Sequence, residues 1–141
     1  MATIFSRIIG GEIPSRMLWE DELCVAFLDV RPLAAGHCLV VPRVEVDQWT
    51  DLDGDLVTHL TSVAHSIGQV LKDVFNPARI GLMIAGFEVP HVHLHVIPID
   101  TMAQLDFSNA DANPDQAALD QYLADLRAAL SAAGHSEVSS R

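Results

Sequence analysis

Three histidines alternate with aliphatic residues in the segment His91-Val92-His93-Leu94-His95. Side chains on an extended strand alternate between its two faces, so the three imidazoles are expected on one face. The aliphatic side chains then lie on the other face, which is expected to meet the core. The pattern therefore predicts a row of imidazoles spaced by about 6–7 Å.

A row of this kind suits chemistry at phosphorus. A neutral imidazole is a good nucleophile near neutral pH, because its unperturbed pKa is about 6.5. It can form a covalent intermediate that divides one difficult step into two. The attacking nitrogen is free only if the other ring nitrogen carries the proton, and a hydrogen bond to a backbone carbonyl can fix that tautomer. Flanking imidazoles can donate hydrogen bonds to phosphate oxygens or a proton to the leaving group.

The histidine pattern alone leaves two other interpretations open. Alternating histidines are common zinc ligands when further ligands come from elsewhere in the chain. A histidine-rich strand that is merely exposed would also fit the alternation.

The chain of 141 residues predicts an α+β fold, with an antiparallel sheet of about five strands and one central helix packed on it. Apolar residues recur every three or four positions from 51 to 75, which is typical of a helix with one buried face. A short helix is expected over 4–9. The expected strands cover 16–20, 23–29, 37–41, 80–85 and 92–99.

The last part of the chain has a different character. A polar, extended stretch is expected over 101–113, and Asn113-Pro114 then resembles the start of an added C-terminal helix. That helix carries one apolar stripe of Leu119, Tyr122, Leu123, Leu126 and Leu130. Residues 136–141 are expected to be frayed. We therefore divide the chain into a domain at 1–108 and a C-terminal extension at 109–141.

The formal net charge is −11, which disfavours nucleic acid and anionic membranes as general partners. No apolar run approaches the roughly 20 residues of a membrane helix, and no signal-peptide pattern opens the sequence. Cys24 and Cys38 lie singly in apolar segments, as buried free thiols do. These features favour a cytoplasmic location.

The segment from His91 to Ile97 has the order His, apolar, His, apolar, His, apolar, apolar. It resembles the signature of the histidine triad family, and the resemblance covers roughly the first hundred residues. Further landmarks stand in the same order as in that family: Ile4-Phe5-Ser6-Arg7-Ile8-Ile9-Gly10-Gly11-Glu12-Ile13-Pro14, Trp19-Glu20-Asp21, Ala26-Phe27-Leu28-Asp29-Val30-Arg31-Pro32, and Gly36-His37-Cys38-Leu39-Val40-Val41-Pro42-Arg43.

The resemblance implies a role for each site residue. His93 resembles the nucleophile, His91 and His95 its phosphate-binding and orienting neighbours, and His37 the family's fourth histidine. Asp29 resembles the carboxylate that binds the ribose hydroxyls. The apolar walls of the base pocket correspond to Phe5, Ile8, Ile13 and Val30. Without the resemblance, the first three of these walls would equally fit a simple core, and Asp29 a turn cap before Pro32.

The implied activity is that of a nucleotide hydrolase or nucleotidyl transferase. It would act at the α-phosphate of a purine nucleotide conjugate of the phosphoramidate type, through a nucleotidyl-histidine. Alternatives are a dinucleoside polyphosphate hydrolase and a nucleotide-binding scaffold with little turnover. His95 favours the hydrolase branches, because the related uridylyltransferases have glutamine there. The resemblance also implies a homodimer, with neither a cofactor nor a catalytic metal.

The sequence departs from the family pattern in two places that bear on the site. Some relatives bind a structural zinc, and the corresponding positions here are Thr3, Ser6 and Glu45, which are poor zinc ligands; we therefore expect no structural zinc. The usual phosphate-binding loop is replaced by residues 85–90. Its Glu88 would repel a phosphate if it pointed inward, unless it acts on a positively charged leaving amine. His59 and His65 are expected to be solvated, and no catalytic role is expected for them or for His135 in the C-terminal tail.

Overall fold

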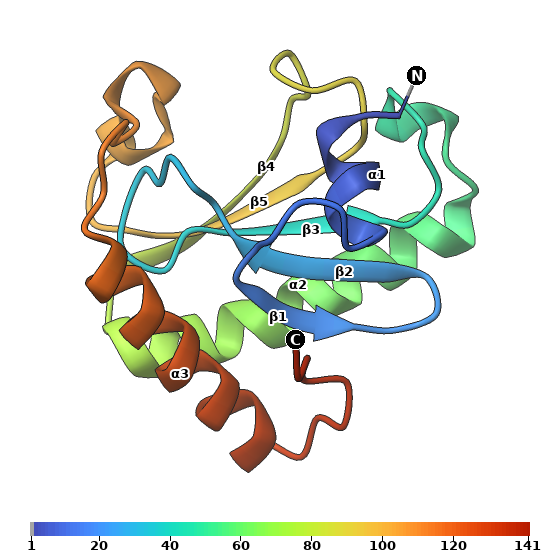
Figure 1. Cartoon of the computed structure of the whole chain (residues 1–141). Helices are drawn as coiled ribbons and strands as arrows, with labels where there is room; N and C mark the ends of the chain where they lie inside the picture. Colours follow the sequence, from blue (N-terminus) through green and yellow to red (C-terminus); the bar gives the residue numbers. More distant parts are fainter. Residues whose placement is uncertain (1) are drawn as a thin grey trace.

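An antiparallel sheet of five strands forms the centre of the computed structural model, which describes residues 2–141 (Figure 1). The strands stand in the order β1-β2-β3-β5-β4. Their bounds are β1 (Met17–Glu20), β2 (Cys24–Leu28), β3 (Cys38–Pro42), β4 (Arg79–Ile84) and β5 (Leu94–Ile99). The predicted α+β fold, with a central helix and an added C-terminal helix, is confirmed.

One face of the sheet packs against the long helix α2 (Gly54–Phe75). Its buried side chains include Leu60, Ile67 and Leu71, which meet the inward residues of the strands. The helix begins three residues later than predicted, because Trp49–Asp51 form a separate 3-10 turn and Asp53 stands at the N-cap. It ends at Phe75, and the C-cap residue Asn76 has a positive φ of 48° that stops the helix.

The opposite face of the sheet packs against the short helix α1 (Ile4–Ile9). The hydroxyl of Thr3 caps this helix by accepting the N–H of Ser6. Phe5 and Ile8 are turned toward the sheet, where they meet a second apolar cluster that includes Phe27. Alternate residues of β2 and β3 thus pack into two different apolar clusters, one against α2 and one against α1.

Strand β5 begins at Leu94, two residues later than predicted, so His91 and His93 precede the strand. The N–H of Val92 donates to the carbonyl of Val46, outside the ladder that pairs β3 with β5. The alternation of faces nevertheless persists through this segment. Val92 and Leu94 lie in the core against α2, as predicted.

The C-terminal extension differs from the prediction in its local structure. The stretch after β5 contains the 3-10 turns η2 (Met102–Leu105) and η3 (Phe107–Asn109) instead of extended chain. Helix α3 (Gln116–Ala132) begins after Asp115, whose carboxylate accepts the N–H of Ala117, so the predicted cap at Asn113 is wrong. Leu126 and Leu130 are fully buried in the same core as α2.

The last residues are held in place, so the predicted fraying of 136–141 is wrong. The N–H of Glu20 donates to the carbonyl of Glu137, and the N–H of Ser139 donates to the carbonyl of Leu18. Arg141 forms an ion pair with Glu20 at 2.9 Å. The division of the chain at residue 108 stays a prediction. Within residues 2–141, no helix has the length and apolar content needed to cross a membrane.

Candidate active site

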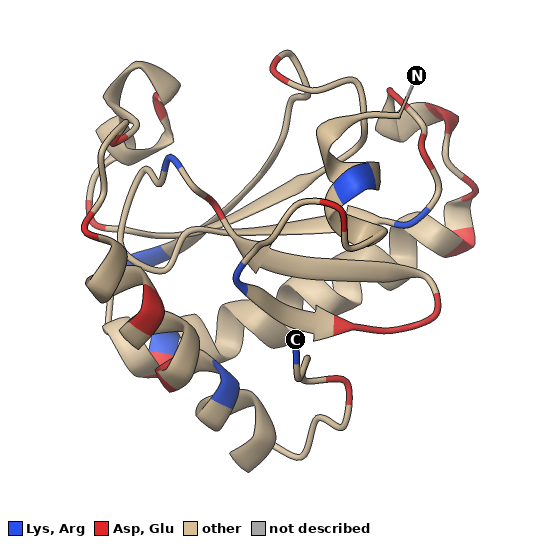
Figure 2. Cartoon of the chain, viewed as in Figure 1, with Lys and Arg blue, Asp and Glu red and all other residues tan. Residues whose placement is uncertain are grey.

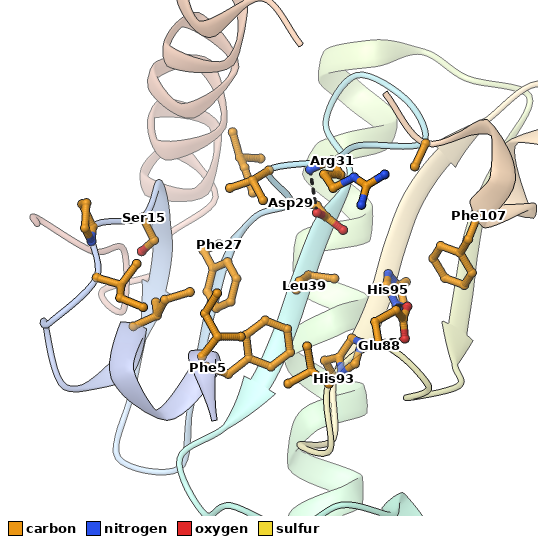
Figure 3. Close-up of a pocket in the computed structure, with 18 residues that line it drawn as sticks. Phe5, Ser15, Phe27, Asp29, Arg31, Leu39, Glu88, His93, His95 and Phe107 are labelled. Atoms are coloured by element: carbon orange, nitrogen blue, oxygen red, sulfur yellow. Dashed lines mark hydrogen bonds and ion pairs between the residues drawn. The ribbon is translucent and has the colours of Figure 1, made fainter. Parts of the chain in front are cut away.

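A cavity of about 320 Å³ opens on the α1 side of the sheet. Helix α1, strands β2 and β3, the loop before β5 and the turn η3 all contribute to it (Figure 3). One end is apolar and is lined by Phe5, Ile8, Ile13, Phe27 and Leu39. The other end carries the side chains of Asp29, Arg31, Glu88, His93 and His95.

The structure brings the sequence-predicted residues together in two layers. The five residues predicted to bind the nucleotide all line the cavity, as do His93 and His95. Val30 is 67% exposed and therefore forms part of the rim, whereas Phe5 is buried. His37 and His91 are buried behind the lining, where they contact the other histidines.

A chain of hydrogen bonds fixes the tautomers of two histidines. The backbone N–H of Leu33 donates to Nδ1 of His37 at 2.9 Å, and a backbone amide can only donate. The proton of His37 is therefore on Nε2, which donates to Nδ1 of His95 at 2.9 Å. It follows that His95 carries its own proton on Nε2. That nitrogen is the only buried side-chain nitrogen or oxygen among residues 2–141 without a hydrogen-bond partner.

The ring of His93 is held in the opposite tautomer. Its Nδ1–H donates to the carbonyl of His91 at 2.7 Å, which leaves the lone pair of Nε2 free. The ring lies edge-on to Phe5, with centroids 4.9 Å apart, and at the same centroid distance from the ring of His95. A ring nitrogen with a free lone pair thus stands beside an N–H donor.

His91 has a positioning role in this arrangement. Its Nε2–H donates to the carbonyl of Pro42 at 2.8 Å, and its Nδ1 accepts the hydroxyl proton of Thr3 at 2.8 Å. With both ring nitrogens in use, the ring cannot turn freely. The carbonyl of His91, which orients His93, is therefore held firmly in place.

Burial keeps these rings neutral. Desolvation, with a contribution from neighbouring histidines, lowers the pKa of His37 to about 3 and that of His95 to about 4. Burial also lowers the pKa of His91. The hydrogen-bond argument and the lowered pKa values thus agree that His95 presents one N–H and no positive charge.

The two carboxylate oxygens of Asp29 have different surroundings: one accepts a hydrogen bond within a turn, and the other lies near His37. Its Oδ1 accepts the N–H of Arg31 at 2.9 Å, so the turn-capping interpretation is correct for that atom. Its Oδ2 lies 3.5 Å from Nε2 of His37. Burial raises the pKa of Asp29, although the N–H of Arg31 and the nearby histidine oppose this effect.

The carboxylate of Glu88 points into the cavity. Its Oε2 lies 3.8 Å from Nε2 of His93, and its Oε1 lies 3.8 Å from Nε2 of His95. The adjacent residue Phe87 points into solvent and is 99% exposed, whereas Val89 packs against the apolar cluster below α1. This anchor directs Glu88 inward.

Several lining residues were not predicted as site residues, among them Phe27, Leu39 and Phe107. Phe27 and Leu39 share a face with the pocket, which the alternation along β2 and β3 could have indicated. Phe107 lies on η3, and its ring packs against His95 with centroids 4.9 Å apart. Nothing near Phe107 in the sequence links it to the histidines.

Among residues 2–141, three groups of side chains have the composition and spacing of metal ligands. In the group of Asp29, His37 and His95, the two histidines bond to each other. In the group of Glu88, His93 and His95, both Nε2 atoms lie 3.8 Å from the carboxylate of Glu88. A third group joins Asp21, Cys24 and His59.

In that third group, the oxygens of Asp21 accept hydrogen bonds from the indole of Trp19 and from the backbone of Leu23 and Cys24. Burial alone would raise the pKa of Asp21, but these bonds and His59 lower it to about 2. His59 lies 2.8 Å from Asp21, so the prediction that it is simply solvated is wrong. The ring of His135, in the C-terminal tail, packs against Trp19 with centroids 5.2 Å apart.

The positions that correspond to a structural zinc site in relatives form a hydrogen-bonded cluster. Ser6 donates to Glu45 at 2.7 Å, the backbone N–H of Thr3 donates to the same oxygen at 2.7 Å, and Thr3 also bonds to His91. Hydroxyl groups are weak zinc ligands, so these side chains do not fit the metal. The expected absence of a structural zinc stays a prediction.

The comparisons with known proteins agree with the fold and the site. The model of the HIT domain matches residues 10–102. An uncharacterized HIT-like protein of Methanocaldococcus jannaschii is 38% identical over 99 residues, which cover 67% of this chain and 77% of that protein. The adenosine 5′-monophosphoramidase of Saccharomyces cerevisiae is 38% identical over 98 residues, which cover 69% of this chain and 62% of the yeast protein.

Among solved structures, a zinc-bound histidine triad family protein from Mycobacterium smegmatis has a TM-score of 0.79 at 28% identity. The match covers 94% of this chain and 96% of the mycobacterial chain. The matched domain contains all three alternating histidines. This chain belongs to the HIT domain family.

The tautomer assignment predicts how the histidines titrate. We expect the ring signals of His37 and His95 to stay those of neutral imidazoles down to about pH 5, because their pKa values are about 3 and about 4. In the unfolded chain both groups titrate near pH 6.5. Below about pH 6.5, the unfolded state binds more protons than the folded state. The stability that these two groups contribute is therefore present above pH 6.5 and is lost as the pH falls toward 4.

Nitrogen-15 NMR of the histidine rings measures both the tautomers and the pKa values. The account requires the Nε2–H form for His37 and His95 and the Nδ1–H form for His93. A His95 ring protonated at Nδ1, or titrating near pH 6.5, would contradict the assignment.

Proposed function

We propose that this protein hydrolyses purine nucleotide conjugates at the α-phosphate, with Nε2 of His93 as the nucleophile. One observation carries the proposal: the free lone pair of His93 and the unpartnered N–H of His95 face the same cavity. A nucleophile beside an unused buried donor is the arrangement that attack on an anionic phosphate requires.

The shape of the cavity supports a binding orientation for the nucleotide. A base fits the apolar end, against the side chains of Phe5, Ile8 and Phe27, which line it. The ribose hydroxyls can then bind the carboxylate of Asp29, which lies between the apolar end and the histidines (Figure 3). The α-phosphate is thereby brought to His93.

The local groups must bind the phosphate without help from the overall charge. Acidic residues are spread over the loops, and basic residues are few (Figure 2). The Nε2–H of His95 is aimed at the charge that develops on a phosphate oxygen during attack. When Nε2 of His93 bonds to phosphorus, the ring becomes cationic, and the bond from its Nδ1–H to the carbonyl of His91 strengthens.

The phosphoramidate class of substrate is supported by two separate considerations. The yeast relative is named an adenosine 5′-monophosphoramidase, so a protein similar to this chain has a name that refers to this class of substrate. Glu88 points into the cavity beside His93 and His95 and offers an additional phosphate group no positive charge, which disfavours the dinucleoside polyphosphate alternative.

We also propose that two copies of the chain associate through β4. This strand lies at the edge of the sheet and is paired on one side only, with β5 (Figure 1). Leu82 is 53% exposed, and it lines an apolar groove between β4 and α2 together with Ile80 and Gly68. An unpaired edge with exposed apolar side chains favours pairing with a second chain.

The His93→Ala variant tests the nucleophile. We expect turnover of adenosine phosphoramidate to fall by more than about 1,000-fold, because the variant has no nucleophilic nitrogen at that position. The affinity for AMP, measured by calorimetry, should change by less than about tenfold, since the base and ribose contacts remain. His65→Ala, on the exposed face of α2, is the matched control. Full hydrolysis by His93→Ala would refute the mechanism.

The Leu82→Arg variant tests the association of two copies. Light scattering should give twice the chain mass of 15.3 kDa for the wild type and the single mass for the variant. The charged side chain would be desolvated at the interface without a partner. Thr58→Arg, on an exposed part of α2, adds the same charge elsewhere and should leave the mass unchanged. A monomeric wild type would contradict the proposal.

A further inference from the structure

Five ionisable side chains line the cavity, and four of them cannot supply a proton to the leaving group. Three are excluded directly: His93 is the nucleophile, Arg31 does not lose its proton, and Asp29 is tied to the turn at the ribose end. His95 can donate a hydrogen bond, but losing its proton would leave an imidazolate. The neighbouring His37 could not replace that proton, because its other nitrogen accepts the N–H of Leu33.

The remaining group, Glu88, lies where the leaving group must be. An in-line displacement places the leaving atom on the far side of phosphorus from Nε2 of His93. The carboxylate faces that nitrogen at 3.8 Å across the space that phosphorus would enter. Its side chain is 43% exposed, so it has room to move outward when a phosphate binds. It then lies beside the leaving atom.

We propose that Glu88 gives a proton to the leaving group and then takes one from water, and that this cycle selects conjugates whose leaving atom is an amine nitrogen. The inference rests on the proposed function, because it concerns the two steps that follow attack by His93. A basic leaving group such as an amine requires protonation as it departs, whereas a weakly basic phenolate does not.

Over the complete cycle, Glu88 gives up one proton and gains one proton. The cycle starts with one proton, taken from solvent, on the carboxylate of Glu88. As Nε2 of His93 bonds to phosphorus, the P–N bond to the leaving group breaks. Its electron pair stays on the leaving nitrogen, which takes the proton of Glu88 and departs as the neutral amine.

The second step restores the starting state. Water enters the position that the amine has left, and its oxygen bonds to phosphorus while the carboxylate of Glu88 accepts its proton. The bond between phosphorus and His93 breaks, with its electron pair returning to Nε2. The products are the nucleoside monophosphate, a neutral His93 and a protonated Glu88.

Glu88→Gln removes the proton transfer and keeps the size of the side chain. Two conjugates of AMP separate the two steps: an alkylamine phosphoramidate, and the p-nitrophenyl ester, whose leaving group needs no proton. We expect kcat/KM for the phosphoramidate to fall by about 100-fold or more. For the ester it should change by less than about tenfold. The ester should then give a burst of one equivalent of p-nitrophenolate followed by slow turnover, because the water step lacks its base.

Two further variants and a control separate chemistry from structure. Glu88→Ala should be partly rescued on the phosphoramidate by added formate, and Glu88→Asp should retain part of the wild-type rate. Glu22→Gln removes an exposed carboxylate in the turn between β1 and β2 and should behave as the wild type.

The outcomes distinguish this inference from the proposed function. If Glu88→Gln hydrolyses both conjugates at wild-type rates, or loses both equally without a burst, the role of Glu88 is refuted while hydrolysis through His93 stands. If the wild type releases no AMP from either conjugate, the proposed function fails, and the role of Glu88 fails with it.

Discussion

The hydrogen bond from the backbone N–H of Leu33 to Nδ1 of His37 sets the arrangement of protons on which the site depends. Because an amide can only donate, the direction of the next bond is fixed, and His95 must present an N–H to the cavity. The loop that carries this amide is held by Gly36, which adopts a φ of +86°. A side chain at Gly36 would overlap the ring of Phe75, so the end of α2 also helps to place His37. A contact on the far side of the sheet thus contributes to the chemistry of the site.

The sheet has to satisfy two requirements along one strand. Leu94 and Val96 pack against α2, while His95 between them faces the cavity and meets Phe107. The neutral state of His37 and His95 follows from this burial, since imidazolium ions inside the sheet would be costly. His95 then supplies an N–H donor, but no positive charge. On the proposed function, a chain with a net charge of −11 binds its anionic substrate by shape and directed hydrogen bonds, which gives the carboxylate of Glu88 a large influence.

Much of the fold could be predicted from local patterns, because the buried face of α2 and the alternating strands are periodic in sequence. The histidine alternation predicted a row of imidazoles on one face, while resemblance to a known family was needed to assign the nucleophile to His93 and to connect it with Asp29 and His37. The features that were missed depend on contacts between distant residues. The tail is ordered by pairing with β1, the ring of Phe107 reaches His95 from a separate turn, and the inward direction of Glu88 follows from the packing of Val89. None of these contacts has a signal in the residues nearby.

The central claim is that Nε2 of His93 forms the covalent bond to the nucleotide. The most direct test is to mix nitrogen-15 histidine-labelled protein briefly with adenosine phosphoramidate, quench it, and map the adduct by mass spectrometry and NMR. The account predicts one adenylyl group on the peptide that contains His93, attached through Nε2, with Nδ1 still carrying its proton. An adduct at Nδ1, or on a different residue, would contradict the account, as would release of AMP without any covalent intermediate.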